Sequence, residues 1–382
     1  MQMVPLQVRP APEPSKLTHY CALLHTSTSL IFFMLMHIAL TADPKLPVPP
    51  RFYGGIERII DLLVRGLVER GHEVTLFAHP DSDTPARLVP YPGRRSQHLW
   101  DLVRNTLTVS RLALTQPDVI HSFGRMAYLA AVLPLRLPKI MSYQRDPSIK
   151  RVQQATWVAG DSLVFTGCSN HITDDIRPHA PARTVYNGVP MDIYDFQPEV
   201  ADDAPLVFLG RIAPIKGVHT AVEVAQQTGR RLLLAGNVPK EHRPYFDERI
   251  HPHLDGERVR YVGPVDDAEK NDLLGRAAAF LMPIEWEEPF GIVMAEAMAC
   301  GTPVIGTRRG AVPEVVTEGE TGFVCDTVDE MVAAVECLRE LDRVACRQRC
   351  EAHFSDQAIV DVYEKLYEKH ASGTVEQAPA RA

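Results

Sequence analysis

The chain is poor in the sequence features that mark several common protein classes. Its seven cysteines form no Cys-x-x-Cys pair and no zinc-type spacing, so we expect reduced thiols rather than a disulfide framework or a zinc site. No Gly-x-Gly-x-x-Gly follows a predicted strand, which disfavours a nicotinamide-dependent dehydrogenase. A net charge of −8 disfavours a general nucleic-acid-binding protein. These absences favour a cytoplasmic protein that has no nucleic acid as a partner.

The N-terminal region also lacks an apolar run long enough to cross a membrane. Residues 30–35 are strongly apolar, but the run is short and little positive charge precedes it. A signal peptide cleaved after Ala42 would also remove residues 36–42, which form the first predicted strand. We therefore interpret residues 1–35 as a non-folded N-terminal extension, with a signal peptide or membrane anchor as the alternative.

Composition and patterning predict the fold class. With 45% hydrophobic and 23% charged residues over 382 positions, the chain is long enough for about two domains. Short apolar runs alternate with helical patterns, which predicts α/β architecture with parallel sheets covered by helices on both faces, in two Rossmann-like domains with a cleft between them. The predicted strands are residues 36–42, 74–78, 118–121, 162–166 and 184–186 in the first half, and 206–210, 231–235, 259–262, 279–282 and 304–306 in the second.

Composition also indicates where the domains end. Residues 197–204 are acidic and polar and form the candidate linker. Ser355 is placed to cap a last helix. The predicted boundaries are therefore residues 36–197 for the N-terminal domain, 198–354 for the C-terminal domain, 355–370 for the last helix and 371–382 for a disordered tail.

The first long helix is predicted after Gly54 and Gly55. Because glycine lacks a Cβ, a ligand can approach the backbone closely at these two positions, and a plain tight turn is the alternative. The residues that follow have helical spacing, with one apolar and one polar face. The apolar face carries Ile56, Ile59, Ile60, Leu63 and Leu67, and the solvent face carries Glu57, Arg58, Asp61 and Arg65.

The most informative stretch lies between Glu288 and Glu296. Its loop contains Pro289 and Gly291 and runs directly into an apolar helix. Carboxylates accept charge-assisted hydrogen bonds from sugar hydroxyls, and N–H groups at a helix start hold phosphate oxygens with help from the helix dipole. A sugar joined to a phosphate needs both kinds of group. An unpaired charge within an apolar helix is costly, so we expect a ligand or a fixed partner for Glu296.

This two-Glu motif is followed by Ala-x-Ala-x-Gly-x-Pro-Val-Ile, and it resembles the retaining GT-B glycosyltransferases of family 4 (glycosyl transferases group 1). The resemblance extends from Met36 to about Lys369 and is strongest over residues 206–324. It implies transfer of a sugar from a nucleoside diphosphate sugar to an acceptor hydroxyl, with retention of anomeric configuration. It also implies that the last helix returns to the N-terminal domain.

The resemblance implies a set of catalytic residues. Arg211 and Lys216 follow the first strand of the second domain and would neutralise the departing diphosphate, whereas an isolated Arg and Lys would be ordinary surface residues. Glu288 would orient the sugar. His121, at the end of a predicted strand, would face the cleft and contact the donor sugar, with a buried structural histidine as the alternative.

The resemblance also implies donor-binding positions at strand ends and around the motif. Glu296 would accept hydrogen bonds from ribose hydroxyls, and the backbone amides of residues 290–293 would hold phosphate oxygens. Glu314 is expected to cap the N-terminus of its own short helix. The implied donor-binding residues are Gly54, Gly55, Gly210, Gly236, Asn237, Val262, Gly263, Phe290, Gly291, Ile292, Val293 and Glu296.

No metal ion and no cofactor are expected, because Arg211, Lys216 and helix amides would supply positive charge and the nucleotide sugar is a substrate. Asp81 and Asp83 match an Asp-x-Asp metal pattern only nominally, since they lie in a polar loop. Two alternatives stay open: a GT-B sugar epimerase or phosphorylase, and a non-catalytic nucleotide-sugar-binding protein. The donor base and sugar, the oligomeric state and the acceptor (saccharide, lipid or small molecule) do not follow from the sequence, which also allows peripheral contact with the inner membrane.

Overall fold

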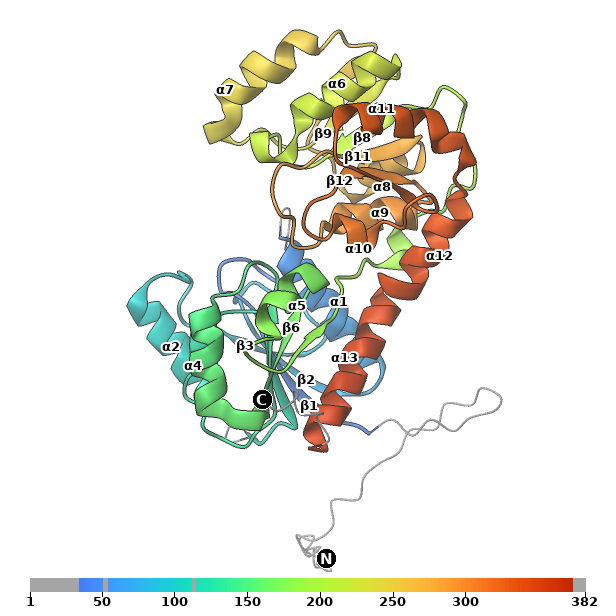
Figure 1. Ribbon diagram of the computed structural model, residues 1–382. Coiled ribbons are helices and arrows are strands. Elements are labelled where there is room, and N and C mark those ends of the chain that lie inside the picture. Colours follow the sequence, from blue (N-terminus) through green and yellow to red (C-terminus); the bar gives the residue numbers. More distant parts are fainter. Residues whose placement is uncertain (1–33, 51–53, 112–114, 374–382) are drawn as a thin grey trace, which may run out of the picture.

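Two parallel sheets, one in each domain, organise the fold (Figure 1). The computed structural model describes residues 34–50, 54–111 and 115–373. All neighbouring strands in both sheets run parallel. This arrangement confirms the predicted α/β class with two Rossmann-like domains.

The N-terminal sheet has seven strands in the order β3-β2-β1-β4-β5-β6-β7. Its strands are β1 (His37–Thr41), β2 (Glu73–Ala78), β3 (Arg87–Pro90), β4 (Val119–Ser122), β5 (Lys139–Tyr143), β6 (Leu163–Gly167) and β7 (Ala182–Thr184). Its helices are α1 (Gly55–Glu69), α2 (Leu99–Ser110), α3 (Met126–Leu129), α4 (Ile149–Ala159) and α5 (Asn170–Ile176).

The C-terminal sheet has six strands in the order β10-β9-β8-β11-β12-β13. Its strands are β8 (Leu206–Leu209), β9 (Leu232–Ala235), β10 (Val259–Gly263), β11 (Ala279–Met282), β12 (Val304–Thr307) and β13 (Gly322–Cys325). The helices of this half are α6 (Val218–Thr228), α7 (Arg243–Tyr245), α8 (Asp267–Gly275), α9 (Ile292–Ala299), α10 (Val312–Val315), α11 (Val328–Glu336), α12 (Arg343–His353) and α13 (Asp356–Ala371).

Helices cover both faces of each sheet, because the inner strands are apolar on both sides. One face of the N-terminal sheet packs against α1 and α13, and the other face packs against α2, α3 and α4. In the C-terminal domain, α9 and α12 share one core cluster and α6 and α11 share another. The α1 residues Ile59, Ile60, Leu63 and Leu67 are fully buried, each worth about 1.5–3 kcal/mol relative to exposure.

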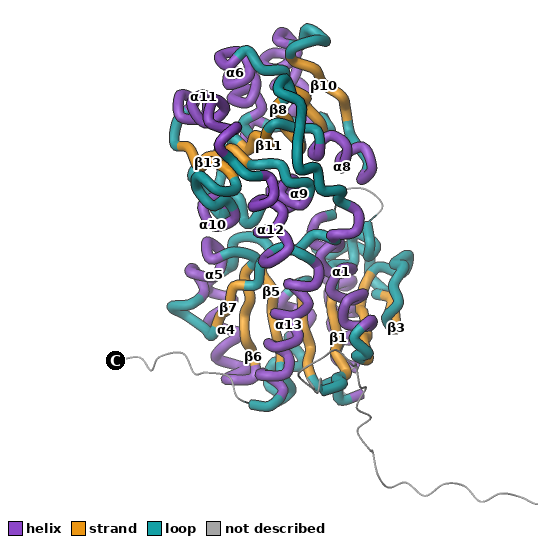
Figure 2. The backbone as a smooth tube through the Cα atoms, turned by 90° about the vertical axis from the view of Figure 1, so that its right-hand side faces the viewer, coloured by secondary structure: helices purple, strands orange, loops and turns teal. Residues whose placement is uncertain are grey.

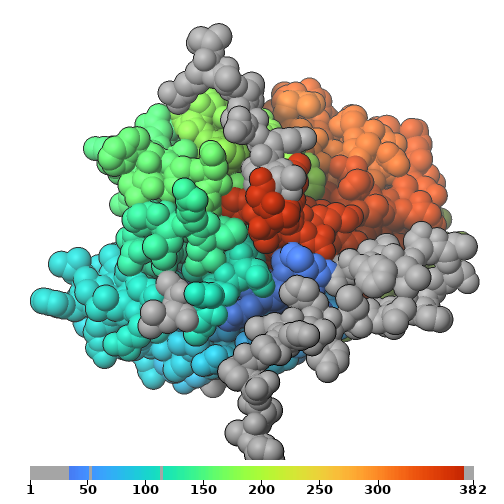
Figure 3. Space-filling view, turned by 90° about the horizontal axis from the view of Figure 1, so that it is seen from below, coloured from blue at the N-terminus to red at the C-terminus, as the bar shows by residue number. Residues whose placement is uncertain are grey.

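The last helix crosses back to the N-terminal domain, as Figures 1 and 2 show. Ser355 caps α13 by accepting the N–H of Ala358 at 3.1 Å, as predicted. The Arg70 guanidinium at the end of α1 pairs with Glu364 of α13 at 2.5 Å. The His370 ring at the far end of α13 contacts the carbonyl of Ser162 at 3.1 Å. Seen from below, the red C-terminal part of the chain lies against green residues of the N-terminal domain (Figure 3). These contacts fix α13 to the N-terminal domain along its length.

Three strands escaped the sequence-based prediction, and one was misplaced. Strand β7 covers residues 182–184 rather than the predicted 184–186. Strands β3, β5 and β13 were not predicted. Strand β5 begins with a lysine, which does not fit the apolar pattern expected of a buried strand. Lys139 is nevertheless fully buried, and its ammonium donates to the carbonyls of Leu135 and Leu137. Burial lowers the pKa of Lys139 to about 8.

Some predictions lie outside the described residues. These are nearly all of the N-terminal extension and most of the tail. Within the described residues, no helix is long and apolar enough to span a lipid bilayer.

Candidate active site

Three glycines lie at the carboxyl ends of neighbouring strands of the C-terminal sheet. Gly210 follows β8, Gly236 follows β9 and Gly263 ends β10. The N–H of Gly236 donates to the carbonyl of Gly263 at 2.8 Å. A Cβ at Gly236, where φ is +133°, would stand 1.8 Å from the carbonyl oxygen of Gly210, so only glycine fits. Parallel sheets bind ligands beyond this edge, and three of the four predicted donor-contacting glycines of this domain lie there.

The other two predicted positions of this edge lie beside the glycines. The backbone carbonyl of Asn237 accepts the N–H of Ile212 at 3.0 Å, and Asn237 is exposed. Val262 is half-buried in β10. The neighbouring Tyr261 hydroxyl donates to the carbonyl of Gly236 at 2.7 Å, and this bond ties β10 to the end of β9.

Lys216 forms an ion pair with Glu288, although 72 positions separate them in the chain. Lys216 ends a short 3-10 turn after β8, and Gly217 follows at φ +66°. A Cβ at Gly217 would stand 1.7 Å from the carbonyl oxygen of Pro283, so the turn packs directly against the end of β11. The indole N–H of Trp286 donates to the same Glu288 oxygen at 3.1 Å, and the ring centre lies 4.9 Å from the ammonium. The Glu288 carboxylate is therefore held between an ammonium and an indole.

Arg211 lies on the same connection between β8 and α6 as Lys216. Its side chain is half-buried, and it pairs with no carboxylate within the described part of the chain. A partly desolvated guanidinium without an acidic partner is available to an anionic ligand. The two cations predicted to hold a diphosphate thus share one short connection, and only Lys216 is already committed to an acid.

Helix α9 begins beside Glu288 with unpaired amides. Its N-cap is Gly291 at φ +76°, and no side chain caps the helix. The N–H groups of Ile292 and Val293 have no acceptor among the described residues, as is usual for the first turn of a helix. The Phe290 ring is buried and packs near Phe354 with ring centres 5.6 Å apart, so only its backbone is available to a ligand. This helix start can accept an anion.

The N-terminus of α1 faces the N-terminus of α9 across the domain boundary. Gly55 begins α1 and Ile292 begins α9, and a Cβ at Gly55 would stand 3.2 Å from Cδ1 of Ile292. At the buried N-cap Gly54, a Cβ would stand 2.8 Å from Cβ of Pro50 and 2.9 Å from Oε2 of Glu57. The positive ends of two helix dipoles therefore approach each other at the domain boundary, near the Glu288 carboxylate that pairs with Lys216.

Glu296 is buried and has the fixed partners that its position in an apolar helix required. Its Oε1 accepts the Tyr194 hydroxyl at 2.8 Å and the Lys270 ammonium at 2.7 Å. Lys270 also pairs with Asp267 at 3.1 Å, and Asp267 pairs with Arg58 of α1 at 3.0 Å. These alternating charges connect the motif helix α9 to the N-terminal domain. The other carboxylate oxygen of Glu296 has no hydrogen bond among the described residues.

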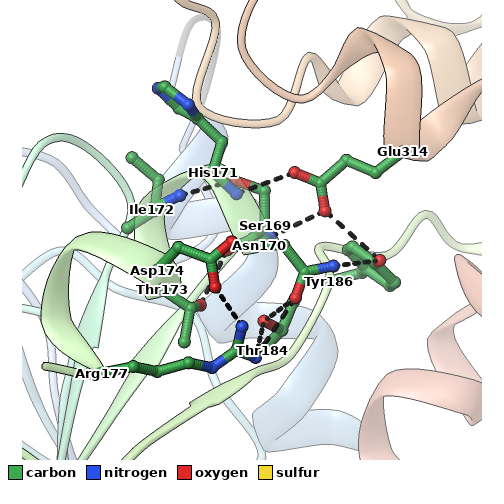
Figure 4. A network of polar contacts seen from close by, with 10 residues as sticks. All are labelled: Ser169, Asn170, His171, Ile172, Thr173, Asp174, Arg177, Thr184, Tyr186 and Glu314. Carbon is green, nitrogen blue, oxygen red and sulfur yellow. Dashed lines mark hydrogen bonds and ion pairs between the residues drawn. The ribbon is translucent and has the colours of Figure 1, made fainter.

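Glu314 caps a helix of the other domain (Figure 4). Its Oε2 accepts the N–H of Asn170 at 2.7 Å, and its Oε1 accepts the N–H of His171 at 2.9 Å. The Tyr186 hydroxyl donates to the same carboxylate at 3.4 Å. The expectation that Glu314 caps its own helix α10 is wrong, because the unpaired first N–H groups of α5 lie opposite it across the domain boundary. The thiol of Cys168 also reaches across, donating to the carbonyl of Pro289 at 3.4 Å.

His121 does not face the cleft, so the prediction that it contacts the donor sugar is wrong. Its ring is fully buried beneath α13, with one nitrogen 2.6 Å from the Tyr367 hydroxyl and the other 2.6 Å from the Ser142 hydroxyl. Burial lowers the pKa of His121 to about 3, so the ring is neutral. Strand alternation turned this side chain toward the helix-covered face, and the alternative of a structural histidine holds.

Sequence reasoning missed three residues of this region. Trp286 and Lys270 lie close to the motif in sequence or space, but a single Trp or Lys carries no distinctive pattern. Glu57 was assigned to the solvent face of α1, yet it is 8% exposed in the first turn of the helix. Burial raises the pKa of Glu57, and the nearby negative charge of Asp43 adds to this effect. In the described part of the chain, no group of three or more His, Cys, Asp or Glu side chains is placed to hold a metal ion.

Comparison with known proteins gives the family. Two family models match adjoining segments, "Glycosyltransferase Family 4" over residues 53–193 and "Glycosyl transferases group 1" over residues 192–351. Together they cover both domains. The chain is a group 1 glycosyltransferase of the GT-B fold.

Individual relatives agree with this assignment. The glycosyltransferase is 28% identical to N-acetyl-alpha-D-glucosaminyl L-malate synthase of Bacillus anthracis, over 87% of this chain and 97% of the relative. Its fold matches AviGT4, a glycosyltransferase involved in avilamycin A biosynthesis, with a TM-score of 0.66 and 27% identity over 88% of this chain and 98% of that one. HepE of Anabaena, solved with UDP and glucose, has a TM-score of 0.66 at 18% identity, over 87% and 100% of the two chains.

Proposed function

We propose that this glycosyltransferase moves a sugar from a nucleoside diphosphate sugar to an acceptor hydroxyl, with retention of anomeric configuration and without a metal ion. The single observation that supports the donor assignment is the ion pair of Lys216 with Glu288, three residues before the uncapped start of α9, with Arg211 on the same connection as Lys216. Cations and unpaired amides suit a diphosphate, and a carboxylate beside them suits sugar hydroxyls. HepE, a protein of the same fold, was solved with UDP and glucose.

The cations act on the leaving group. As the bond from the sugar carbon to the phosphate oxygen breaks, negative charge grows on the diphosphate. Arg211, Lys216 and the amides of Ile292 and Val293 form a preorganised set of donors for that charge, and each such donor is typically worth about 10² to 10³ in rate. Because these groups supply the positive charge, the proposed reaction needs no divalent cation.

The carboxylates position the donor. Glu288 would accept hydrogen bonds from hydroxyls of the transferred sugar, while its contacts with Lys216 and Trp286 keep the carboxylate in place. Glu296 would use its second oxygen for the ribose, since its first is occupied by Tyr194 and Lys270. Positioning of this kind lowers the entropic barrier to reaction.

The acceptor would approach from the N-terminal domain. In the proposed retaining reaction, the acceptor oxygen attacks the sugar carbon on the face from which the diphosphate departs. The acceptor proton then moves to the departing phosphate oxygen, so no protein nucleophile is required. The contacts of Asp267 with Arg58 and of Glu314 with α5 bring the domains together, and a closed site limits loss of the donor to water.

Two experiments test this function. A thermal-shift screen with UDP-, GDP- and ADP-linked sugars should identify the donor, because a ligand at about 100 times its dissociation constant adds roughly 2.7 kcal/mol of apparent stability. Incubation of that donor with candidate acceptors, followed by NMR of the product, then gives the anomeric configuration. Release of an isomerised nucleotide sugar would indicate an epimerase instead, and donor binding without turnover would indicate a binding protein.

A further inference from the structure

Helix α2 of the N-terminal domain has an inverted distribution of polar and apolar residues. It buries two polar side chains, Asp101 and Asn105, fully or nearly so. On its outer side it exposes large apolar side chains, which soluble helices usually turn inward. These exposed residues are Leu99, Trp100, Val103 and Leu107, and we call them the apolar face of α2.

The buried polar residues set this orientation. Asn105 bonds twice to Gly93, accepting its N–H at 2.9 Å and donating to its carbonyl at 2.9 Å. Asp101 accepts both the backbone N–H and the side-chain Nε of Arg95 at 3.1 Å. Because these bonds satisfy the inner polar groups, α2 cannot roll to bury its apolar face without leaving them unpaired, at a cost of about 1–3 kcal/mol each.

The apolar face of α2 forms a continuous stripe with a basic margin. At about 100° per residue, Leu99, Val103, Leu107 and Trp100 fall within an arc of about 100°. Trp100 is 70% exposed and Leu107 is 55% exposed. The next positions around the helix hold Arg104 and Arg111, both exposed. A contiguous apolar surface beside guanidinium groups marks an interaction site rather than scattered surface residues.

The N-terminal domain, which carries α2, has a net positive charge, whereas the C-terminal part of the chain has a net negative charge. Residues 36–197 contain 18 Lys and Arg against 15 Asp and Glu, whereas residues 198–382 contain 20 against 32. Helix α2 lies at the outer edge of the N-terminal domain, away from the C-terminal domain (Figure 1). Helix α4 packs on the same sheet face and exposes Trp157 to 87%. Two of the three tryptophans of the chain are thus exposed on this side of the basic domain.

We propose that the apolar face of α2, with Arg104 and Arg111, docks the enzyme on a lipid bilayer that contains anionic lipids. Helices of this kind lie in the plane of the membrane interface, with the apolar side among the acyl chains. Tryptophan favours that interface because its ring is apolar and its N–H is polar. Arginine pairs with lipid phosphates, and the net positive N-terminal domain is attracted to an extended anionic surface.

Docking extends the proposed function but does not depend on it. Vesicle binding requires no donor, acceptor or turnover, so it can be measured in the purified full-length protein whether or not the sugar transfer is correct. Conversely, loss of vesicle binding leaves the residues of the donor site unchanged. The failure of one proposal is therefore distinguishable from the failure of the other.

Co-sedimentation with vesicles tests the docking. The wild-type chain is expected to bind phosphatidylcholine vesicles containing phosphatidylglycerol, and to bind pure phosphatidylcholine vesicles at least tenfold more weakly. A Trp100→Ser, Leu107→Ser double variant should bind the anionic vesicles at least about tenfold more weakly than wild type, since each substitution removes a large apolar side chain that docking would bury in the bilayer. The control is Val344→Ser, Val362→Ser, which removes two other exposed apolar side chains outside α2 and should bind as the wild type does.

Two further measurements separate the contribution of the arginine charges to vesicle binding from that of the apolar side chains. In Arg104→Gln, Arg111→Gln, the preference for anionic vesicles and the sensitivity to salt should fall together. In a Trp157→Phe background, the fluorescence of Trp100 should shift to the blue on vesicle addition. Circular dichroism and a melting temperature within a few degrees of wild type would show that the variants fold.

Several results would overturn the proposal. Wild-type protein that binds no vesicles, or a serine double variant that binds them as tightly as wild type, would each do so. The second outcome would assign binding to another segment, such as the apolar residues 30–35. Dimerisation of the wild-type chain that disappears in the serine variant, without vesicle binding, would make the apolar face of α2 a contact between protein chains.

Discussion

The carboxylate of Glu314 in the C-terminal domain accepts the backbone N–H of Asn170 in the N-terminal domain at 2.7 Å. A second bond, from His171, uses its other oxygen. A helix start in one domain is thus completed by an acid of the other. Because this contact lies next to the donor loop, where the Cys168 thiol meets the carbonyl of Pro289, it couples domain closure to the proposed donor site.

We expect Glu314→Gln to weaken closure while leaving donor recognition nearly intact. Glutamine offers one acceptor oxygen and no charge, so a charge-assisted bond is lost. A loss of about 1.4 kcal/mol predicts a tenfold lower kcat/KM for transfer, with nucleotide affinity changed less than twofold. Small-angle scattering should show a more open molecule. Exposed Glu320→Gln is the control, and an equal loss of nucleotide affinity in Glu314→Gln would contradict this role.

Arg211→Ala and Lys216→Ala should each reduce transfer by about 10² to 10³. The reason is that both remove positive charge from the proposed leaving diphosphate. Melting temperatures should change little, because neither side chain is in a core cluster. Lys240→Ala, an exposed lysine of the same domain, is the matched control. If either variant keeps a steady-state rate within threefold of wild type, the residue that it replaces does not stabilise the leaving diphosphate.

Glu288→Ala should reduce discrimination among sugars more than affinity for the nucleotide. The carboxylate is proposed to bind sugar hydroxyls, whereas the phosphates are held by other groups. Competition binding with the nucleoside diphosphate and with several of its sugar conjugates would measure both effects. Glu287→Ala, the exposed neighbouring acid, serves as the control. A parallel loss for the bare nucleotide and its conjugates would place Glu288 in phosphate binding.

Gly55→Ala should impair transfer without lowering stability. The new methyl group would stand 3.2 Å from Cδ1 of Ile292, which pushes apart the facing starts of α1 and α9. In α1 itself, alanine is favoured over glycine by about 0.5–1 kcal/mol. We expect an unchanged or higher melting temperature and roughly tenfold lower kcat/KM. Adding Ile292→Val removes the opposing Cδ1 and should restore part of the rate; a variant with no recovery would point to another cause.

Glu57→Gln should change how stability depends on pH. The pKa of Glu57 is raised in the folded protein above its ordinary value of 4.5, mainly by burial. Its ionised form therefore disfavours folding, and this cost grows as pH rises from about 4.5 through the raised folded pKa. The variant should melt higher than wild type at pH 8, with the difference shrinking toward pH 4. A constant difference across that range would show that the Glu57 titration is not responsible.

The sequence predicted the parts of the site that depend on local chain order. Gly210, Arg211 and Lys216 follow a strand and precede a helix, and a parallel sheet places such connections at its ligand-binding edge. The apolar neighbours of Glu296 also predicted that it is buried, and a buried carboxylate is costly unless another group pairs with it. The identity of that partner, Lys270, did not follow, since nothing local specifies which lysine reaches a given acid.

The predictions that were wrong concern residues whose surroundings are set by contacts between distant segments. His121 ends a strand as predicted, but the face of the sheet that α13 covers decided that its ring meets Tyr367 rather than a ligand. Glu57 lies in the first turn of a helix with clear amphipathic spacing, yet the packing around Gly54 buries it. Periodicity predicts which residues share a face, but it does not say what the end of a helix will meet.

The sequence by itself determined two α/β domains, the strand-to-helix connection that carries Arg211 and Lys216, and the apolar helix that carries Glu296. Those features follow from local spacing and from the cost of burying an unpaired charge. Only the tertiary structure decided that Lys216 meets Glu288, that Glu314 caps α5 of the other domain, and that α2 turns its tryptophan outward. Each of these depends on segments far apart in the chain, which the closing of sheets and domains brings within hydrogen-bonding distance.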